Sequence, residues 1–143
     1  MPIKPRLNKK NIRRVLEIAE KSQRARTHKI FRFSIWADFT GQHKTVSDMV
    51  RHPCGTAGCI GGWGCVLACY DRNRDTPLNS QIVLTYKTAN RFFGITGAEG
   101  IYLYHGHWHS MGINATTRDV ITKLKNILKT GKIINPEFDK RYL

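Results

Sequence analysis

The sequence predicts a small, single-domain, mainly α-helical protein built around a central helix rich in glycine and cysteine, with a minor two-stranded β element. Three observations support this fold class. Apolar residues recur at helical spacing in several segments. Residues typical of helix caps flank those segments. The chain has 143 residues, of which 41% are hydrophobic, and this is enough for one domain with its own core.

The first predicted helix spans residues 9–24, with Asn8 as its N-cap. Its apolar stripe consists of Ile12, Val15, Leu16 and Ala19. Residues 1–8 contain two prolines and two cations, so we expect a flexible basic arm there. Residues 9–143 are then expected to form the single helical domain.

Alternating residues after this helix predict a short strand. Phe31, Phe33 and Ile35 alternate with Arg32 and Ser34. Ile133 and Ile134, near the other end of the chain, are its expected partner strand.

The segment HPCGTAGCIGGWGCVLACY predicts the central helix, over 57–70 with Thr56 as N-cap. Its four glycines each cost about 1 kcal/mol of helix stability relative to alanine. They are Gly58, Gly61, Gly62 and Gly64. Because glycine lets two backbones approach closely, we expect other elements to pack against this helix, namely the helices over 81–93 and 117–130.

Capping signals predict the remaining helices. Ser80 is expected to begin the helix over 81–93, and Gly94 to end it. The buried stripe of that helix is expected to contain Ile82, Tyr86, Ala89 and Phe93. Thr96 and Glu99 have the spacing of a capping box and predict a short helix to Tyr104.

Thr116 and Asp119 have the same spacing and begin the helix over 117–130, which Gly131 ends. The helix pair around Gly94 suggests a helix-turn-helix motif, but Ala89 and Gly94 are five residues apart where that motif has four. We therefore expect a plain helical hairpin.

Charge is the strongest functional signal. Lys and Arg number 24 against 10 Asp and Glu, which gives a net charge of +14 and a pI near 10.1. The first predicted nucleic-acid-binding patch contains Lys9, Lys10, Arg13, Arg14, Lys21, Arg24, Arg26, Lys29 and Arg32. The second contains Lys125, Lys129 and Lys132. Cations grouped in this way attract polyanions and gain from the release of counterions.

We therefore predict a non-enzymatic protein that binds DNA or RNA through phosphates. Solubility alone would be met by mixed charge, so a single-sign excess favours a polyanionic partner. An acidic protein is the alternative partner. Phe31, Phe33 and Trp36 could stack on bases, although such residues more often lie in a core. No residues stand out as a base-reading element, so we expect no sequence-specific recognition.

The cysteines favour a packed, reduced interior over a metal site. Cys54, Cys59, Cys65 and Cys69 lack the C-x2-C spacing of structural zinc sites. The opening residues, MPIKPRLNKK, lack the apolar segment of a secretory signal, so we expect a cytoplasmic location. We expect no cofactor, no bound metal and no association with a membrane, because the longest apolar stretch is about half of the roughly twenty residues that a spanning helix needs.

A cysteine hydrolase is a further alternative. Cys54 would lie just before the predicted central helix, whose N-terminus would lower the pKa of its thiol. A histidine among His105, His107 and His109 could then act as its base. Those three histidines could instead bind a divalent metal if the segment were extended. We favour a surface loop in which Trp108 is an anchor.

The segment CGTAGCIGGW resembles a C-G-T-x-x-C-x-x-G-W motif of small, uncharacterised phage and prophage proteins. The matching residues are Cys54, Gly55, Thr56, Cys59, Gly62 and Trp63, followed by those over 89–96 and 130–133. The resemblance spans about residues 30–134. It implies a phage protein in the cytoplasm of a bacterial host and assigns no activity. It also makes an accessory protein that inhibits an acidic host protein the main alternative to nucleic-acid binding.

Overall fold

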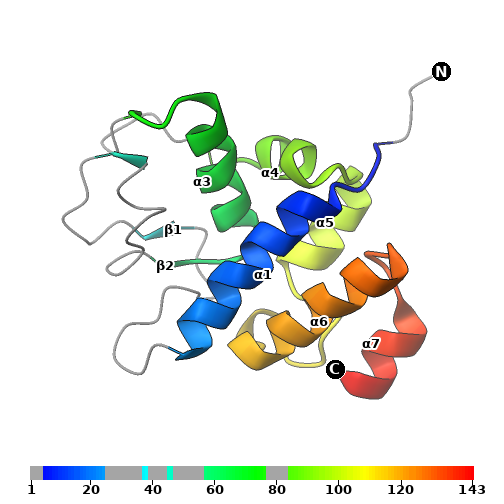
Figure 1. Ribbon diagram of the computed structural model, residues 1–143. Coiled ribbons are helices and arrows are strands. Elements are labelled where there is room, and N and C mark those ends of the chain that lie inside the picture. The colour runs from blue at the N-terminus through cyan, green and yellow to red at the C-terminus, as the bar shows by residue number, and fades with distance from the viewer. Residues whose placement is uncertain (1–4, 25–36, 39–44, 47–56, 77–83) are drawn as a thin grey trace.

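Six α-helices make up most of the described chain in this computed structural model, which describes residues 5–24, 37–38, 45–46, 57–76 and 84–143 (Figure 1). The helices are α1 (Lys9–Arg24), α3 (Ile60–Arg72), α4 (Tyr86–Phe93), α5 (Gly97–Tyr104), α6 (Thr117–Thr130) and α7 (Pro136–Tyr142). A short 3-10 helix, η1, covers Gly112–Asn114. Strands β1 (Ala37–Asp38) and β2 (Ala57–Gly58) form an antiparallel pair. The prediction of a mainly α-helical fold is confirmed, whereas the observed strand pair lies at other residues than those expected to form the β element.

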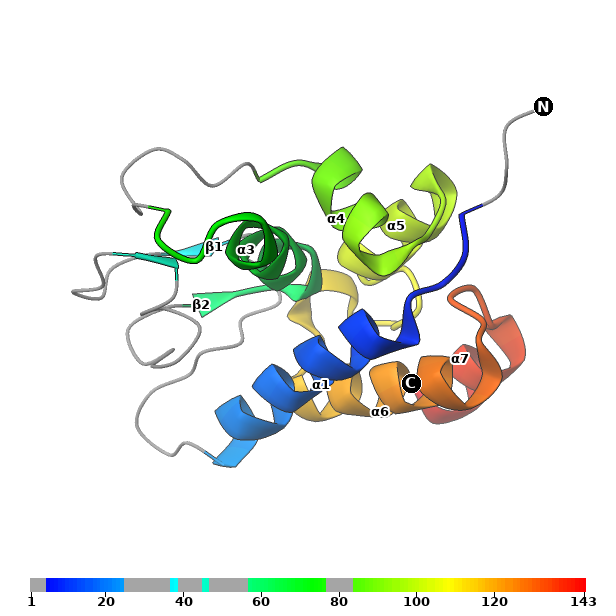
Figure 2. The same ribbon diagram turned by 45° about the horizontal axis from the view of Figure 1, so that its top comes forward.

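Two groups of helices share one core. α1 and α6 run in opposite directions and lie side by side in both views (Figures 1 and 2). α3 packs against α4 and also contacts α1 and α5. We expected the 117–130 helix to wrap the central helix, but α6 packs mainly on α1 because the apolar stripes of both helices are buried in the same core.

Local capping behaves as predicted at most helix ends. Asn8 caps α1 through Asn11, and capping boxes begin α5 at Thr96 and α6 at Thr116. Gly94 and Gly131 end α4 and α6 in the left-handed conformation.

The central helix begins later than predicted. α3 starts at Ile60 with Cys59 as its N-cap, and the Cys59 thiol accepts a hydrogen bond from the Gly62 backbone at 3.3 Å. Ala57 and Gly58 are not helical, because their backbones pair with β1. Thr56, the predicted cap, lies outside the described residues.

α4 is also shorter than predicted. It starts at Tyr86 because the Thr85 side chain accepts a hydrogen bond from the Thr88 backbone and caps the helix there. Tyr86 is 40% exposed rather than buried, whereas Ala89 and Phe93 are in the core as expected. Ser80 and Ile82 lie outside the described residues.

The C-terminal region corrects two further expectations. Ile133 and Ile134 do not form a strand: the Ile133 side chain is buried in the core, and α7 follows. The strand predicted at Phe31–Ile35 lies outside the described residues. Helix α7 was not predicted, although Pro136 at its start and Glu137 in its first turn are typical helix-start signals.

The expectation that glycine permits close packing is confirmed at Gly64. A Cβ atom on Gly64 would stand 2.7 Å from Cε2 of Phe93, a fully buried ring of α4. α3 and α4 therefore approach each other this closely because position 64 has no side chain. Among the described helices, none combines the length and the apolar character that crossing a bilayer requires.

Candidate nucleic-acid interface

The outer face of α1 carries the described part of the first predicted patch. Its apolar stripe faces the core, so the remaining positions turn outward. The exposed cations of α1 are Lys9, Lys10, Arg13, Lys21 and Arg24. None of them takes part in an ion pair within the described part of the chain.

The outer face of α6 carries the second patch. Lys125 and Lys129 are exposed on the helix, and Lys132 is exposed just after it. Arg118 is also exposed and lies seven residues before Lys125, which places it on the same face of the helix. Sequence reasoning missed Arg118, although this spacing was the signal that could have found it.

The fold brings the two patches together. The Lys125 ammonium lies 4.0 Å from the Glu20 carboxylate of α1, and the Lys9 side chain lies beside Gly131 at the end of α6. We call the combined area the α1–α6 basic surface. It comprises Lys9, Lys10, Arg13, Lys21, Arg24, Arg118, Lys125, Lys129 and Lys132. Glu17 and Glu20, the acids of α1, only partly offset these nine cations.

Many carboxylates cannot neutralise this surface because they have internal partners. Glu99 and Asp119 cap helices, and Asp119 also lies 3.2 Å from His109. Asp71 binds Arg14, and Asp139 binds Lys123. The outer faces of α1 and α6 therefore keep most of their positive charge, although other exposed cations lie elsewhere on the described chain, among them Arg72, Arg74 and Arg141.

Arg14 differs from the other cations of its patch. Its guanidinium donates two hydrogen bonds to the Asp71 carboxylate, at 2.7 and 2.9 Å, and lies over the Phe92 ring. Arg14 therefore joins α1 to α3 and α4 and contributes little free charge. Arg26, Lys29 and Arg32 lie outside the described residues, so their part in the patch stays a prediction.

The thiol groups are buried. Cys59, Cys65 and Cys69 are all in the interior, and burial raises the pKa of Cys59 and raises that of Cys65 to about 11. Cys54 lies outside the described residues. Since α3 begins at Ile60, the helix does not start just after Cys54, as the hydrolase interpretation assumed.

The histidine segment forms turns, as we favoured. The Trp108 indole N–H donates to the Leu103 carbonyl at 3.0 Å, which confirms it as an anchor. The His109 ring binds Asp119, and its Nδ1 accepts from the Met111 backbone. Within the described residues, the three histidines do not form a group arranged to hold a metal ion.

The predicted hairpin is present, with α5 as its second helix. α5 carries one acid and no lysine or arginine, so it cannot bind phosphates through cationic side chains. This composition does not suit the recognition helix of a helix-turn-helix motif.

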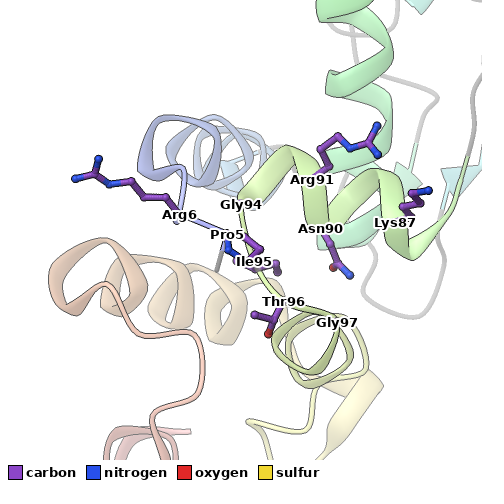
Figure 3. Close-up of a pocket in the computed structure, with 9 residues that line it drawn as sticks. All are labelled: Pro5, Arg6, Lys87, Asn90, Arg91, Gly94, Ile95, Thr96 and Gly97. Atoms are coloured by element: carbon purple, nitrogen blue, oxygen red, sulfur yellow. The ribbon is translucent and has the colours of Figure 1, made fainter. Parts of the chain in front are cut away.

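A cavity lies between the N-terminal segment, α4 and the start of α5 (Figure 3). Its cavity volume is about 850 Å³, and Arg6, Lys87 and Arg91 line it. Figure 3 shows the Arg6 and Arg91 side chains extending in different directions, so these cations do not converge on one point. The cavity therefore has a basic rim rather than a site for a single small anion.

This cavity exists because the N-terminal segment crosses the α4–α5 turn. The Asn8 backbone N–H donates to the Phe93 carbonyl at 2.8 Å, and a Cβ on Gly94 would stand 1.9 Å from the Arg6 carbonyl oxygen. Residues 5–8 of the expected arm are therefore in contact with the domain, whereas residues 1–4 lie outside the described chain.

Comparisons with protein-family models, curated proteins and solved structures find no match.

Proposed function

We propose that this chain is a non-enzymatic nucleic-acid-binding protein of phage type, which holds the phosphate backbone on the α1–α6 basic surface in the host cytoplasm. The observation that carries this proposal is the packing of α1 against α6. Two cationic segments about a hundred residues apart in the sequence become neighbouring rows, separated by roughly 8–10 Å between helix axes. A single polyanion can then contact both rows.

The chemistry of the surface suits phosphate better than a base edge. Lysine predominates in it, and a lysine ammonium on a long stem contacts phosphates as a point charge without fixing a base identity. Binding of this kind releases condensed counterions, so its affinity falls as the salt concentration rises.

A salt titration tests the proposal. We expect labelled DNA and RNA to bind at about 50 mM salt, and log K to fall linearly with log salt concentration up to about 200 mM. Absence of binding at low salt, with a protein that is folded by circular dichroism, would overturn the proposal.

An acidic host protein is the second candidate partner, and the cavity beside α4 favours it. The hollow is large enough for a side chain or loop of a partner, and three cations lie around its rim. Lys87→Glu and Arg91→Glu should weaken capture of such a protein and leave nucleic-acid binding intact, because neither residue belongs to the α1–α6 basic surface. If these variants weaken nucleic-acid binding but leave capture of the acidic protein unchanged, this candidate is rejected.

A further inference from the structure

A groove between α6 and α7 opens beside the basic surface. It has a cavity volume of about 450 Å³, in the range of known small-ligand sites. Its lining includes Thr122, Lys125, Asn126 and Lys129 of α6 and the rings of Phe138 and Tyr142 on α7. Because Lys125 and Lys129 also belong to the basic surface, the groove and that surface are continuous.

One wall of the groove is aromatic. The rings of Phe138 and Tyr142 are one helical turn apart, with centroids separated by 4.9 Å and planes tilted by 39°. Phe138 is half-buried and forms the inner part of the wall, whereas Tyr142 is 59% exposed. The Arg141 guanidinium lies over the Tyr142 ring, 5.4 Å from its centroid. An exposed aromatic ring with an arginine stacked on it is a platform of the kind that binds single-stranded nucleic acid, through both base stacking and cation–π contacts.

Polar groups line the opposite side. Asn126 accepts a hydrogen bond from the Asn135 amide at 3.2 Å through Oδ1, and within the described chain its own amide N–H groups have no partner. The Thr122 hydroxyl donates to the Arg118 carbonyl, which leaves its oxygen able to accept. The groove thus offers a donor and an acceptor to the edge of a planar ring.

The helix that carries the wall is held in place before any ligand arrives. α7 is fixed to α6 by the buried Lys123–Asp139 ion pair. Because the backbone of α7 is already ordered by this contact, less entropy is lost when a ligand binds.

We infer that this groove takes a nucleobase of a single-stranded nucleic acid, stacked on Tyr142, while the adjoining phosphates lie on Lys125 and Lys129. The inference rests on the proposed function and adds a preference for unpaired bases. Bases inside a duplex are already stacked on their neighbours and cannot present a face to Tyr142.

Fluorescence anisotropy on the full chain tests the inference with three labelled probes of equal length: oligothymidine, an abasic strand and a duplex. We expect oligothymidine to bind more tightly than the abasic strand. Tyr142→Ala should weaken oligothymidine binding by about 5- to 150-fold, the effect of losing one stacked base. The affinity of this variant for the abasic strand and for the duplex should not change. The slope of its log K against log salt concentration should not change either. Tyr142→Phe, the matched control, keeps the ring and should stay within about twofold of the unmodified protein.

The outcomes separate this inference from the proposed function. In one outcome, all probes bind with a steep salt dependence, but Tyr142→Ala leaves oligothymidine binding unchanged or weakens binding of the abasic strand equally. The groove is then not a base site, and the proposal that phosphates bind the α1–α6 basic surface is retained. If none of the probes binds at low salt, both ideas are overturned.

Discussion

The Lys123 ammonium lies 2.7 and 3.0 Å from the two carboxylate oxygens of Asp139, and the lysine is completely buried. The Tyr102 hydroxyl donates to the same carboxylate, and its ring lies 5.4 Å from the ammonium. The three residues come from α6, α7 and α5. Burial lowers the pKa of Lys123, and Asp139 opposes that shift. This network, together with the packing of Leu143 against the core, attaches α7 and its aromatic wall to the rest of the domain.

Removal of the carboxylate should therefore be costly. We expect Asp139→Asn to lower the free energy of unfolding by about 3–5 kcal/mol, because it leaves the Lys123 ammonium buried without a counterion. Urea denaturation measures this change. Glu137→Gln, an exposed position on the same helix, is the control and should change stability by less than about 0.5 kcal/mol. A loss no larger than that of the control would contradict the structural role of the pair.

Gly64 should not tolerate a methyl group. Gly64→Ala gains about 1 kcal/mol of helix propensity but forces the buried Phe93 ring to move, at a cost of about 1–3 kcal/mol. We expect a net loss of up to about 2 kcal/mol in thermal or urea unfolding. Gly97→Ala is the matched control, because a Cβ there meets no atom within 4 Å. A stabilised Gly64→Ala variant would show that α3 and α4 are not so closely packed.

Cys65 should make stability depend on alkaline pH. Burial raises the pKa of its thiol from 9.0 to about 11, so between these values the unfolded chain loses a proton that the native chain retains. The contribution of the Cys65 thiol to the free energy of unfolding is complete below pH 9. It decreases as the pH rises toward 11, by on the order of 2–3 kcal/mol in total. Cys65→Ser should flatten this part of the pH–stability curve. Equal slopes for the two proteins would rule out the thiol as the cause.

Substitutions of two adjacent arginines of α1 should affect different properties, namely nucleic-acid binding for Arg13 and stability for Arg14. Arg13→Gln removes an exposed cation from the basic surface, so we expect weaker binding of nucleic acid and unchanged stability. Arg14→Gln breaks the partly exposed pair with Asp71, so we expect a stability loss of at most about 1 kcal/mol and little effect on binding. Urea denaturation and anisotropy on the same two variants separate these effects. Equal binding losses would place Arg14 on the interface as well.

Cations of α6 should contribute to binding together with those of α1. We expect Lys129→Ala and Lys10→Ala each to reduce the slope of log K against log salt by about 1, since each removes one phosphate contact. Lys87→Ala, an exposed lysine of α4, is the control and should not alter the slope. If only the α1 variant changes the slope, the two helices do not form one surface.

The local features of this chain could be predicted from its sequence because they depend on residues close together along it. The caps at Asn8, Thr96 and Thr116 and the stops at Gly94 and Gly131 each need only a few neighbouring side chains. The apolar stripe of α1 also follows from helical periodicity. Boundaries were predicted less well where another segment competed, as at Ala57 and Gly58, whose backbones pair with β1.

The tertiary structure alone decided which cations share a surface. The sequence established the charge excess, the basic faces of two helices and the closely packed glycine-rich helix. It could not show that α6 packs on α1, that Arg14 pairs with Asp71, or that Lys123 turns inward to Asp139. These relationships join residues that are far apart in the chain. Helical periodicity predicts the direction in which each side chain leaves its helix, but it does not predict which residue that side chain contacts.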